Sequence, residues 1–163
     1  MMTKRIKSAI ARVLFLTLFC TSVAARAAEG RFQALSGTWA GSGYAAMKDG
    51  SQERLRCKAR YQVGSGGESF SLDMTCASDS VSLNVVTSVT ASGDRIHGVW
   101  SETTRGVGGN IGGRADARQI SAVLDGAGFD AGISIATRGS RQTVVIRPSA
   151  MDVSEISISM SRH

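Results

Sequence analysis

The sequence predicts an all-β protein: an antiparallel meander of about eight to ten strands that closes as an up-and-down barrel, with a β-sandwich as the alternative. Three observations support this prediction. Apolar and polar residues alternate with a period of two along most of the chain, which is typical of strands that bury one face. Turn signals, most of them containing glycine, recur between the alternating runs. No segment after the N-terminal leader has the apolar spacing of a helix.

Residues 1–27 have the layout of a secretory signal peptide. Basic residues come first, an apolar run follows over residues 13–20, and Ala25-Arg26-Ala27 supplies a small-residue cleavage site. The apolar run is too short for a transmembrane helix, which needs ~20 residues. We therefore expect cleavage after Ala27 or Ala28 and export to the periplasm or beyond. The mature chain is then a single all-β domain, residues 28–163, without an integral membrane span.

Loss of the leader removes most of the positive charge. The chain has 19 basic and 13 acidic residues, which is a formal charge of +6. Five of the basic residues and none of the acidic ones lie in the leader, so the mature chain has 14 against 13. Its basic residues are not interleaved with aromatic residues that could stack on bases. The composition therefore argues against a nucleic-acid partner.

The alternating runs predict individual strands, and turn signals separate them. The first strand opens at Gly37-Thr38-Trp39, where glycine lets the barrel wall bend and tryptophan fills the space beneath. Further strands are predicted at residues 55–63, 70–76, 81–85, 95–100, 129–135 and 156–161. Turn signals lie at 48–51, 64–67, 92–94, 126–128 and 139–140. The glycine-rich run 106–113 is predicted to be a bend or a mobile loop.

One predicted hairpin specifies its own register. If Gly66 and Gly67 are the central residues of a primed two-residue turn, the apolar residues on either side of it face one another. A slip by one residue would place apolar side chains opposite polar ones. The predicted pairs are Val63 with Phe70, Tyr61 with Leu72, Ala59 with Met74, Cys57 with Cys76 and, on the other face, Arg60 with Asp73.

Cys57 and Cys76 are the only cysteines of the mature chain, because Cys20 lies in the leader. Directly opposed residues of an antiparallel pair lie within disulfide distance, and export implies an oxidising compartment. We therefore predict a Cys57–Cys76 disulfide, which contributes about 3 kcal/mol for a loop of this length. A redox or metal-binding pair is the alternative, but the chain has no Cys-x-x-Cys motif and its two histidines lie elsewhere.

We recognise no catalytic constellation, metal site or cofactor motif in the sequence. The glycines around Ser42 do not make a nucleophile elbow, and the run 106–113 lacks the spacing of a phosphate-binding loop. His97 is predicted to point to solvent, on the strand face opposite Trp100. Glu102 and Asp73 are the candidates for the acid pair of a small hydrolase, which is one alternative function.

Two sets of residues are candidates for binding. Segment 101–105 closes a predicted strand, and its Glu102 and Arg105 either form a salt-bridged rim of the barrel or contact a partner. Four aromatic residues belong to the apolar face of their strands, where they would line a cavity for a small apolar ligand. These are Trp39, Tyr61, Phe70 and Trp100.

The opening Leu35-Ser36-Gly37-Thr38-Trp39 resembles the first-strand motif of the calycins. This group includes the lipocalins and small periplasmic inhibitors of bacterial metalloproteases, and the resemblance implies an up-and-down barrel with Trp39 on its floor. It also implies a late arginine over the tryptophan, for which Arg147 and Arg162 are candidates. The mature chain is also similar to uncharacterised small exported β-proteins of alphaproteobacteria, which share two cysteines and the Gly-x-Trp-x-Glu-x-Thr-Arg segment, here 98–105.

The sequence thus predicts an exported periplasmic barrel that acts as a non-enzymatic binding or interaction module. Its partner would be a small apolar ligand or a periplasmic protein. An inhibitor of a secreted protease, presenting residues 29–34 or a loop to the enzyme, is the alternative, and a small hydrolase is the second alternative. An integral outer-membrane barrel is not expected, because the mature chain has too few aromatic residues for two girdles.

Overall fold

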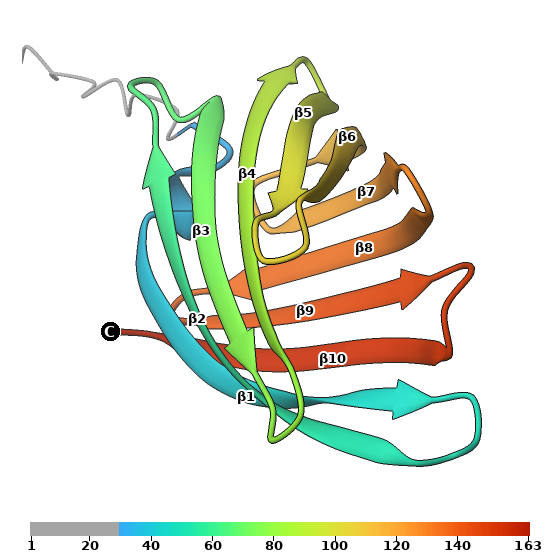
Figure 1. The fold of residues 1–163 in the computed structure, drawn as a ribbon. Coiled ribbons are helices and arrows are strands. Elements are labelled where there is room, and N and C mark those ends of the chain that lie inside the picture. Colours follow the sequence, from blue (N-terminus) through green and yellow to red (C-terminus); the bar gives the residue numbers. More distant parts are fainter. Residues whose placement is uncertain (1–29) are drawn as a thin grey trace, which may run out of the picture.

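The computed structural model describes residues 30–163, so the predicted leader and its cleavage site lie outside the described residues. The described chain forms one closed antiparallel barrel in which each strand pairs with the next and β1 pairs with β10 (Figure 1). This architecture confirms the up-and-down barrel and excludes the β-sandwich. The elements are η1 (Gln33–Leu35), β1 (Gly37–Met47), β2 (Gln52–Val63), β3 (Ser69–Ala77), β4 (Ser82–Ser92), β5 (Arg95–Glu102), β6 (Val107–Ala115), β7 (Gln119–Gly126), β8 (Phe129–Arg138), β9 (Arg141–Pro148) and β10 (Val153–Arg162).

The period-two pattern sorts side chains between the two faces of the wall. Along β2, Leu55, Cys57 and Ala59 are buried inside the barrel and the residues between them are exposed outside it. This separation follows from the pleat of a strand, which points successive side chains to opposite faces. Within the described residues no helix is long and apolar enough to cross a membrane.

The β2–β3 hairpin has the predicted register. Cys57 pairs with Cys76 and forms the predicted disulfide, while Tyr61 pairs with Leu72 and Arg60 with Asp73. The turn is wider than predicted. Gly64 still donates its N–H to the carbonyl of Ser69, so residues 65–68 form a four-residue loop. Within this loop the N–H of Gly67 donates to the carbonyl of Gly64.

The prediction of a bend or mobile loop over residues 106–113 is wrong. Gly106 belongs to the turn after β5, but Val107 begins β6. Gly109, Gly112 and Gly113 are paired with β5 on one side and β7 on the other. Because these glycines have no side chain, the neighbouring strands can approach closely. A Cβ atom on Gly109 would lie 1.7 Å from the carbonyl oxygen of Asp125 on the adjacent strand.

The barrel has a closed end and an open end. The segment before β1, including η1, folds under one end, where Phe32 is fully buried and donates its backbone N–H to the carbonyl of Gly67. We call this end the floor. The other end, which we call the mouth, is formed by the turns β1–β2, β3–β4, β5–β6, β7–β8 and β9–β10.

Candidate functional site

The floor is packed with aromatic side chains. Trp39 has no exposed surface, and its indole N–H donates a 2.7 Å hydrogen bond to the carbonyl of Leu35 in η1. The rings of Phe32 and Phe70 meet edge to face with centroids 4.8 Å apart, and Tyr61 lies 5.7 Å from Phe70. These contacts fill the floor half of the interior.

Arg162 supplies the arginine that the calycin resemblance implies. Its guanidinium lies 4.7 Å from the centre of the Trp39 ring and also donates to the carbonyl of Ala34. The other candidate, Arg147, is on the outer face and forms a 2.7 Å ion pair with Glu155. Arg162 therefore holds the end of β10 against the start of β1 and η1.

A short polar chain crosses the interior above the floor. The hydroxyl of Tyr61 donates to the Gln142 side-chain carbonyl at 3.1 Å, and the Gln142 amide donates to the hydroxyl of Thr137 at 3.2 Å. Burial raises the pKa of Tyr61, so the phenol stays neutral. None of the three hydrogen-bonded side chains is ionised, and we assign them a structural role.

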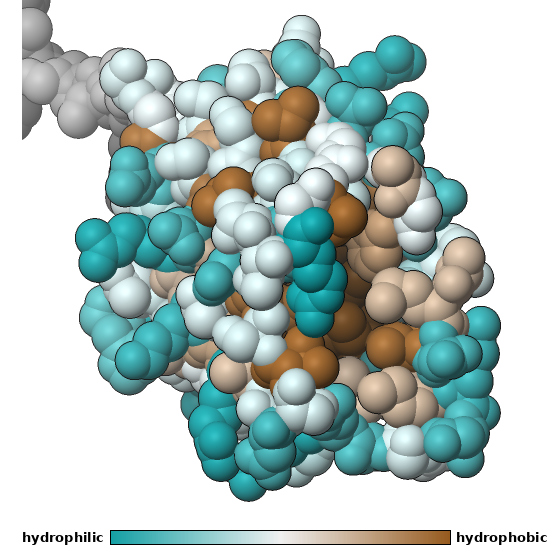
Figure 2. All heavy atoms as spheres, viewed as in Figure 1, coloured by the Kyte–Doolittle hydropathy of each residue, from teal (hydrophilic) through white to brown (hydrophobic). Residues whose placement is uncertain are grey.

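The mouth half of the interior is apolar and incompletely filled. Its inward-facing residues belong to the same strand faces as the core, yet they keep part of their surface exposed. Figure 2 shows the result as a hollow whose deeper atoms are hydrophobic, beside the β5–β6 turn of Figure 1. We call the partly exposed residues the mouth lining: Met74, Leu83, Val85, Leu124, Phe129, Ile133, Ile146, Val153 and Ile156.

Trp100 lies between the packed core and the mouth lining. Its ring packs against Phe129 with centroids 5.2 Å apart, and its indole N–H donates to the carbonyl of Asp125 at 3.2 Å. Thr87 pairs with Trp100 across β4 and β5. The hydroxyl of Thr87 has no hydrogen-bond partner among the described residues, so the apolar wall carries one unsatisfied polar atom here.

Glu102 lies at the rim of the mouth and is only 5% exposed. One carboxylate oxygen accepts from the backbone N–H groups of Asn84 and Thr104, and the other accepts from the N–H and guanidinium of Arg105. Desolvation acts to raise the pKa of Glu102, but the hydrogen bonds outweigh it and hold that pKa at about 2. The rim is thus salt-bridged, and Glu102 holds the β5–β6 turn. A partner contact through the exposed Arg105 stays a prediction.

The structure does not assemble the acid pair considered for a hydrolase. Asp73 is on the outer face of β3, whereas Glu102 faces the interior with both oxygens already bonded. His97 is exposed on the outer face of β5, as predicted. In residues 30–163 no three acidic, histidine or cysteine side chains lie close enough to hold a metal ion.

The N-terminal segment does not form an exposed arm in the part that the structure describes. Phe32 is buried, and Arg31 forms a 2.8 Å ion pair with Glu68 of the β2–β3 loop. Residues 30–34 are therefore part of the floor, and they are not presented as an inhibitory segment would be. Glu29 lies outside the described residues.

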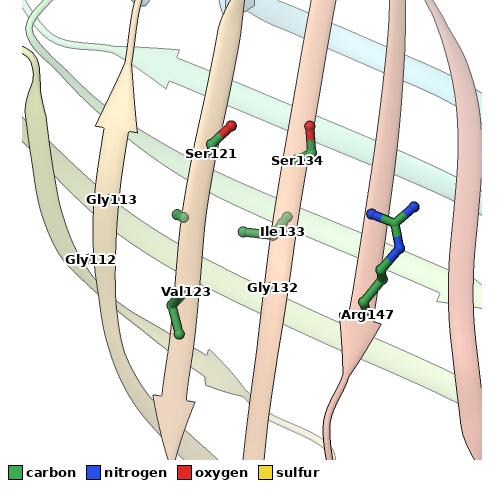
Figure 3. Close-up of a pocket in the computed structure, with 9 residues that line it drawn as sticks. Gly112, Gly113, Ser121, Val123, Gly132, Ile133, Ser134 and Arg147 are labelled. Carbon is green, nitrogen blue, oxygen red and sulfur yellow. The ribbon is translucent and has the colours of Figure 1, made fainter.

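A shallow groove lies on the outer wall across β6, β7, β8 and β9. Gly112 and Gly132 leave the backbone bare on either side of Val123, and Arg147 lies at one side of the groove (Figure 3). Val123 is 57% exposed. The groove offers no buried polar group.

The sequence pattern points to four aromatic residues and gives no sign of the aliphatic residues of the mouth lining. All four aromatic candidates face the interior, but Trp39, Tyr61 and Phe70 belong to the packed floor half, and only Trp100 borders the mouth lining. The alternation already showed which face of each strand is apolar. It carried no signal for the height of a residue in the barrel.

Comparisons with known proteins show the fold alone. No protein-family model and no curated protein sequence matches this chain. The barrel is similar to the crystal structure of Rv2717c from M. tuberculosis, with 12% identity and a TM-score of 0.65 over 80% of this chain and 94% of that chain. It is also similar to the S-type phycobiliprotein lyase CPES from Guillardia theta, with 11% identity and a TM-score of 0.55 over 81% of this chain and 90% of that one. This chain therefore has a calycin-like barrel.

Proposed function

We propose that this protein is an exported, non-enzymatic binding module that holds a small apolar molecule in the mouth half of its barrel. The partly exposed mouth lining carries the proposal. Apolar side chains that face inward and are left partly exposed favour an apolar guest, because burying their surface is worth roughly 25 cal/mol per Å². A cavity of this kind, with few polar groups, is typical of small-molecule sites.

The polar groups near the mouth limit the chemistry of the guest. Glu102 already accepts four hydrogen bonds and has no free oxygen to bind a cation. The Thr87 hydroxyl is buried within the wall without a hydrogen-bond partner in residues 30–163, so it presents no polar surface to a guest. An uncharged, apolar guest fits this lining best.

Export and the absence of catalysis belong to the same proposal. The predicted leader supports export, and the Cys57–Cys76 disulfide suits an oxidising compartment. The separation of Asp73 from Glu102 by the barrel wall supports binding over hydrolysis. A phycobiliprotein lyase has a similar barrel, which is compatible with a role in which a barrel handles a small molecule.

The test uses two tryptophan substitutions on one strand. Leu124 faces the interior of β7, and Val123 faces the outer groove. We expect wild type to bind N-phenyl-1-naphthylamine, an uncharged dye that brightens in apolar surroundings. Leu124→Trp fills the mouth half and should weaken dye binding at least tenfold, or about 1.4 kcal/mol. Val123→Trp is the control and should bind within about twofold of wild type, measured by fluorescence titration.

The outcomes separate the interior from the outer wall. Loss of dye binding in Leu124→Trp alone supports the proposal. Equal binding by all three proteins, or a loss confined to Val123→Trp, would overturn it. Thermal unfolding of both variants checks that each remains folded. Native mass spectrometry of gently purified protein then identifies any natural guest from its mass.

A further inference from the structure

We propose that the outer face of β1, β2 and β3 docks on the surface of an anionic lipid bilayer. Four basic side chains on β2 carry the contact, and we call them the cation row: Arg54, Arg56, Lys58 and Arg60. This inference goes beyond the proposed function, because the cation row is on the outside of the barrel and the mouth lining is inside it.

The pleat of β2 produces the row. The four basic residues alternate with the buried Leu55, Cys57 and Ala59, so all four point outward and all four are exposed. Residues two apart on a strand lie about 6.5–7 Å from each other. The row is thus a line of four like charges roughly 20 Å long. Such a line is unfavourable for an isolated protein and favourable against a negative surface.

The surroundings leave these charges open. The neighbouring strands carry small outward residues beside the row, Ala40 and Ser42 on β1 and Thr75 and Ala77 on β3, and together they form a groove in the outer wall. Asp73 pairs with Arg60 in the ladder, and Asp79 lies in the turn after β3. No ion pair found within residues 30–163 includes a member of the row.

Exposed apolar side chains lie at the mouth end of the row. Tyr44 pairs with Arg54 across β1 and β2 and is 51% exposed. Met151 in the β9–β10 turn is 43% exposed. Next to it, the carbonyl of Asp152 accepts a 2.7 Å hydrogen bond from the N–H of Lys48. Basic residues beside tyrosine and methionine are typical of surfaces that contact lipid headgroups and the adjacent acyl region.

Other anionic partners fit less well. A closed barrel has no free strand edge, so an acidic peptide has no ladder to join. Tyr44 is the only aromatic among the exposed large apolar residues of the described chain, so single-stranded nucleic acid has no series of stacking platforms. A bilayer can contact the whole row and the Tyr44 end at the same time.

Co-sedimentation with vesicles tests the proposal. Wild type, the double variant Arg56→Thr/Lys58→Thr and the control Arg138→Thr/Arg141→Thr are used as the cell produces them, so all three carry the same N-terminus. The control removes two exposed cations from the β8–β9 hairpin near the floor. Vesicles contain phosphatidylcholine alone or with phosphatidylglycerol. We expect the β2 variant to bind the anionic vesicles roughly 30-fold more weakly, about fivefold per cation, and the control to bind like wild type.

The other outcomes are equally definite. Binding that raised salt weakens, that requires phosphatidylglycerol and that depends on β2 supports the docking surface. Equal losses in the two double variants, equal binding to neutral vesicles, or no wild-type binding would overturn it. Binding of soluble heparin through the row without vesicle binding would also overturn it and indicate a soluble polyanion instead. All substituted residues are exposed, and melting curves verify that the variants fold.

Discussion

The side chains of Trp39 and Arg162 join the first and last strands of the barrel. Trp39 lies at the start of β1 and Arg162 at the end of β10, and the guanidinium lies over the indole at 4.7 Å. A cation over an indole face adds on the order of 0.5–2 kcal/mol to the burial of the ring. The resemblance of the opening motif to calycins predicted this contact and named Arg162 as one of two candidates. Spacing alone could not choose between Arg162 and Arg147, because that choice depends on the strand face.

Glu102 shows how a rim residue can hold a turn. Its carboxylate collects three backbone N–H groups that strand β4 and the β5–β6 turn would otherwise leave without protein partners. The hydrogen bonds hold the pKa of Glu102 at about 2. The sequence placed Glu102 at the rim but could not show these donors, because backbone groups carry no residue-specific signal.

Glu102→Gln should therefore lower the melting temperature in a pH-dependent way. A glutamate whose pKa is depressed by folding contributes stability above its unfolded pKa of about 4.3, and this contribution is lost as the pH falls toward the folded value. We expect the gap between wild type and variant to be full above about pH 5 and to close toward pH 2. Glu155→Gln, which removes an exposed ion pair, should change the melting temperature little at any pH. A constant gap for Glu102→Gln would contradict this account.

At the scale of elements, β6 shows why glycine content alone does not identify a loop. Glycine-rich runs usually signal turns or mobile loops, and the sequence predicts one over residues 106–113. In the barrel, Gly109 and Gly113 face inward, where neighbouring backbones approach closely. A side chain there would collide with β7. Glycine is thus required by close packing of a curved wall, which a strand pattern does not reveal.

The adjacent pair Gly112 and Gly113 tests this explanation. A Cβ on Gly113 would lie 2.3 Å from the carbonyl oxygen of Ser121, whereas a Cβ on Gly112 would meet nothing within 4 Å. We expect Gly113→Ala to destabilise the protein by ~1–3 kcal/mol through overpacking. Gly112→Ala should be neutral or stabilising by up to ~1 kcal/mol, since it restricts the unfolded chain. Urea unfolding measures both, and equal effects would refute the packing argument.

The β2–β3 hairpin was predictable because two independent patterns agreed on its register. Apolar residues match on the inner face, and Arg60 meets Asp73 on the outer face. The width of its loop was not predictable. In this loop the carbonyl of Gly67 accepts a hydrogen bond from Phe32, and Glu68 forms an ion pair with Arg31. Both partners belong to the segment before β1, which is distant in sequence.

At the scale of the whole molecule, alternation predicted the strands but not their closure. A sandwich and a barrel bury the same face of each strand, so the pattern of β2 or β8 suits either. Closure depends on the pairing of β1 with β10 and on the floor that η1 builds under them. The opening motif pointed to this solution only through its resemblance to calycins.

The candidate site was less predictable than the fold. Ile133 and Ile135 are alike in sequence and share one face of β8, but Ile135 is buried while Ile133 is partly exposed. The two residues differ in their height in the barrel, which the alternation does not encode. Three of the four aromatic candidates lie at the floor, where they pack against one another. The mouth lining is mostly aliphatic and has no sequence motif that would identify it.

Methyl NMR with N-phenyl-1-naphthylamine tests the central claim most directly, because it locates the guest. If the mouth half is the binding cavity, the methyl signals of Leu124, Ile146 and Ile156 should shift on titration. The methyls of Ile96 and Ile120 near the floor and of Val123 on the outer wall should stay in place. Shifts confined to Val123 and its outer groove, or no shifts at saturating dye, would contradict the account.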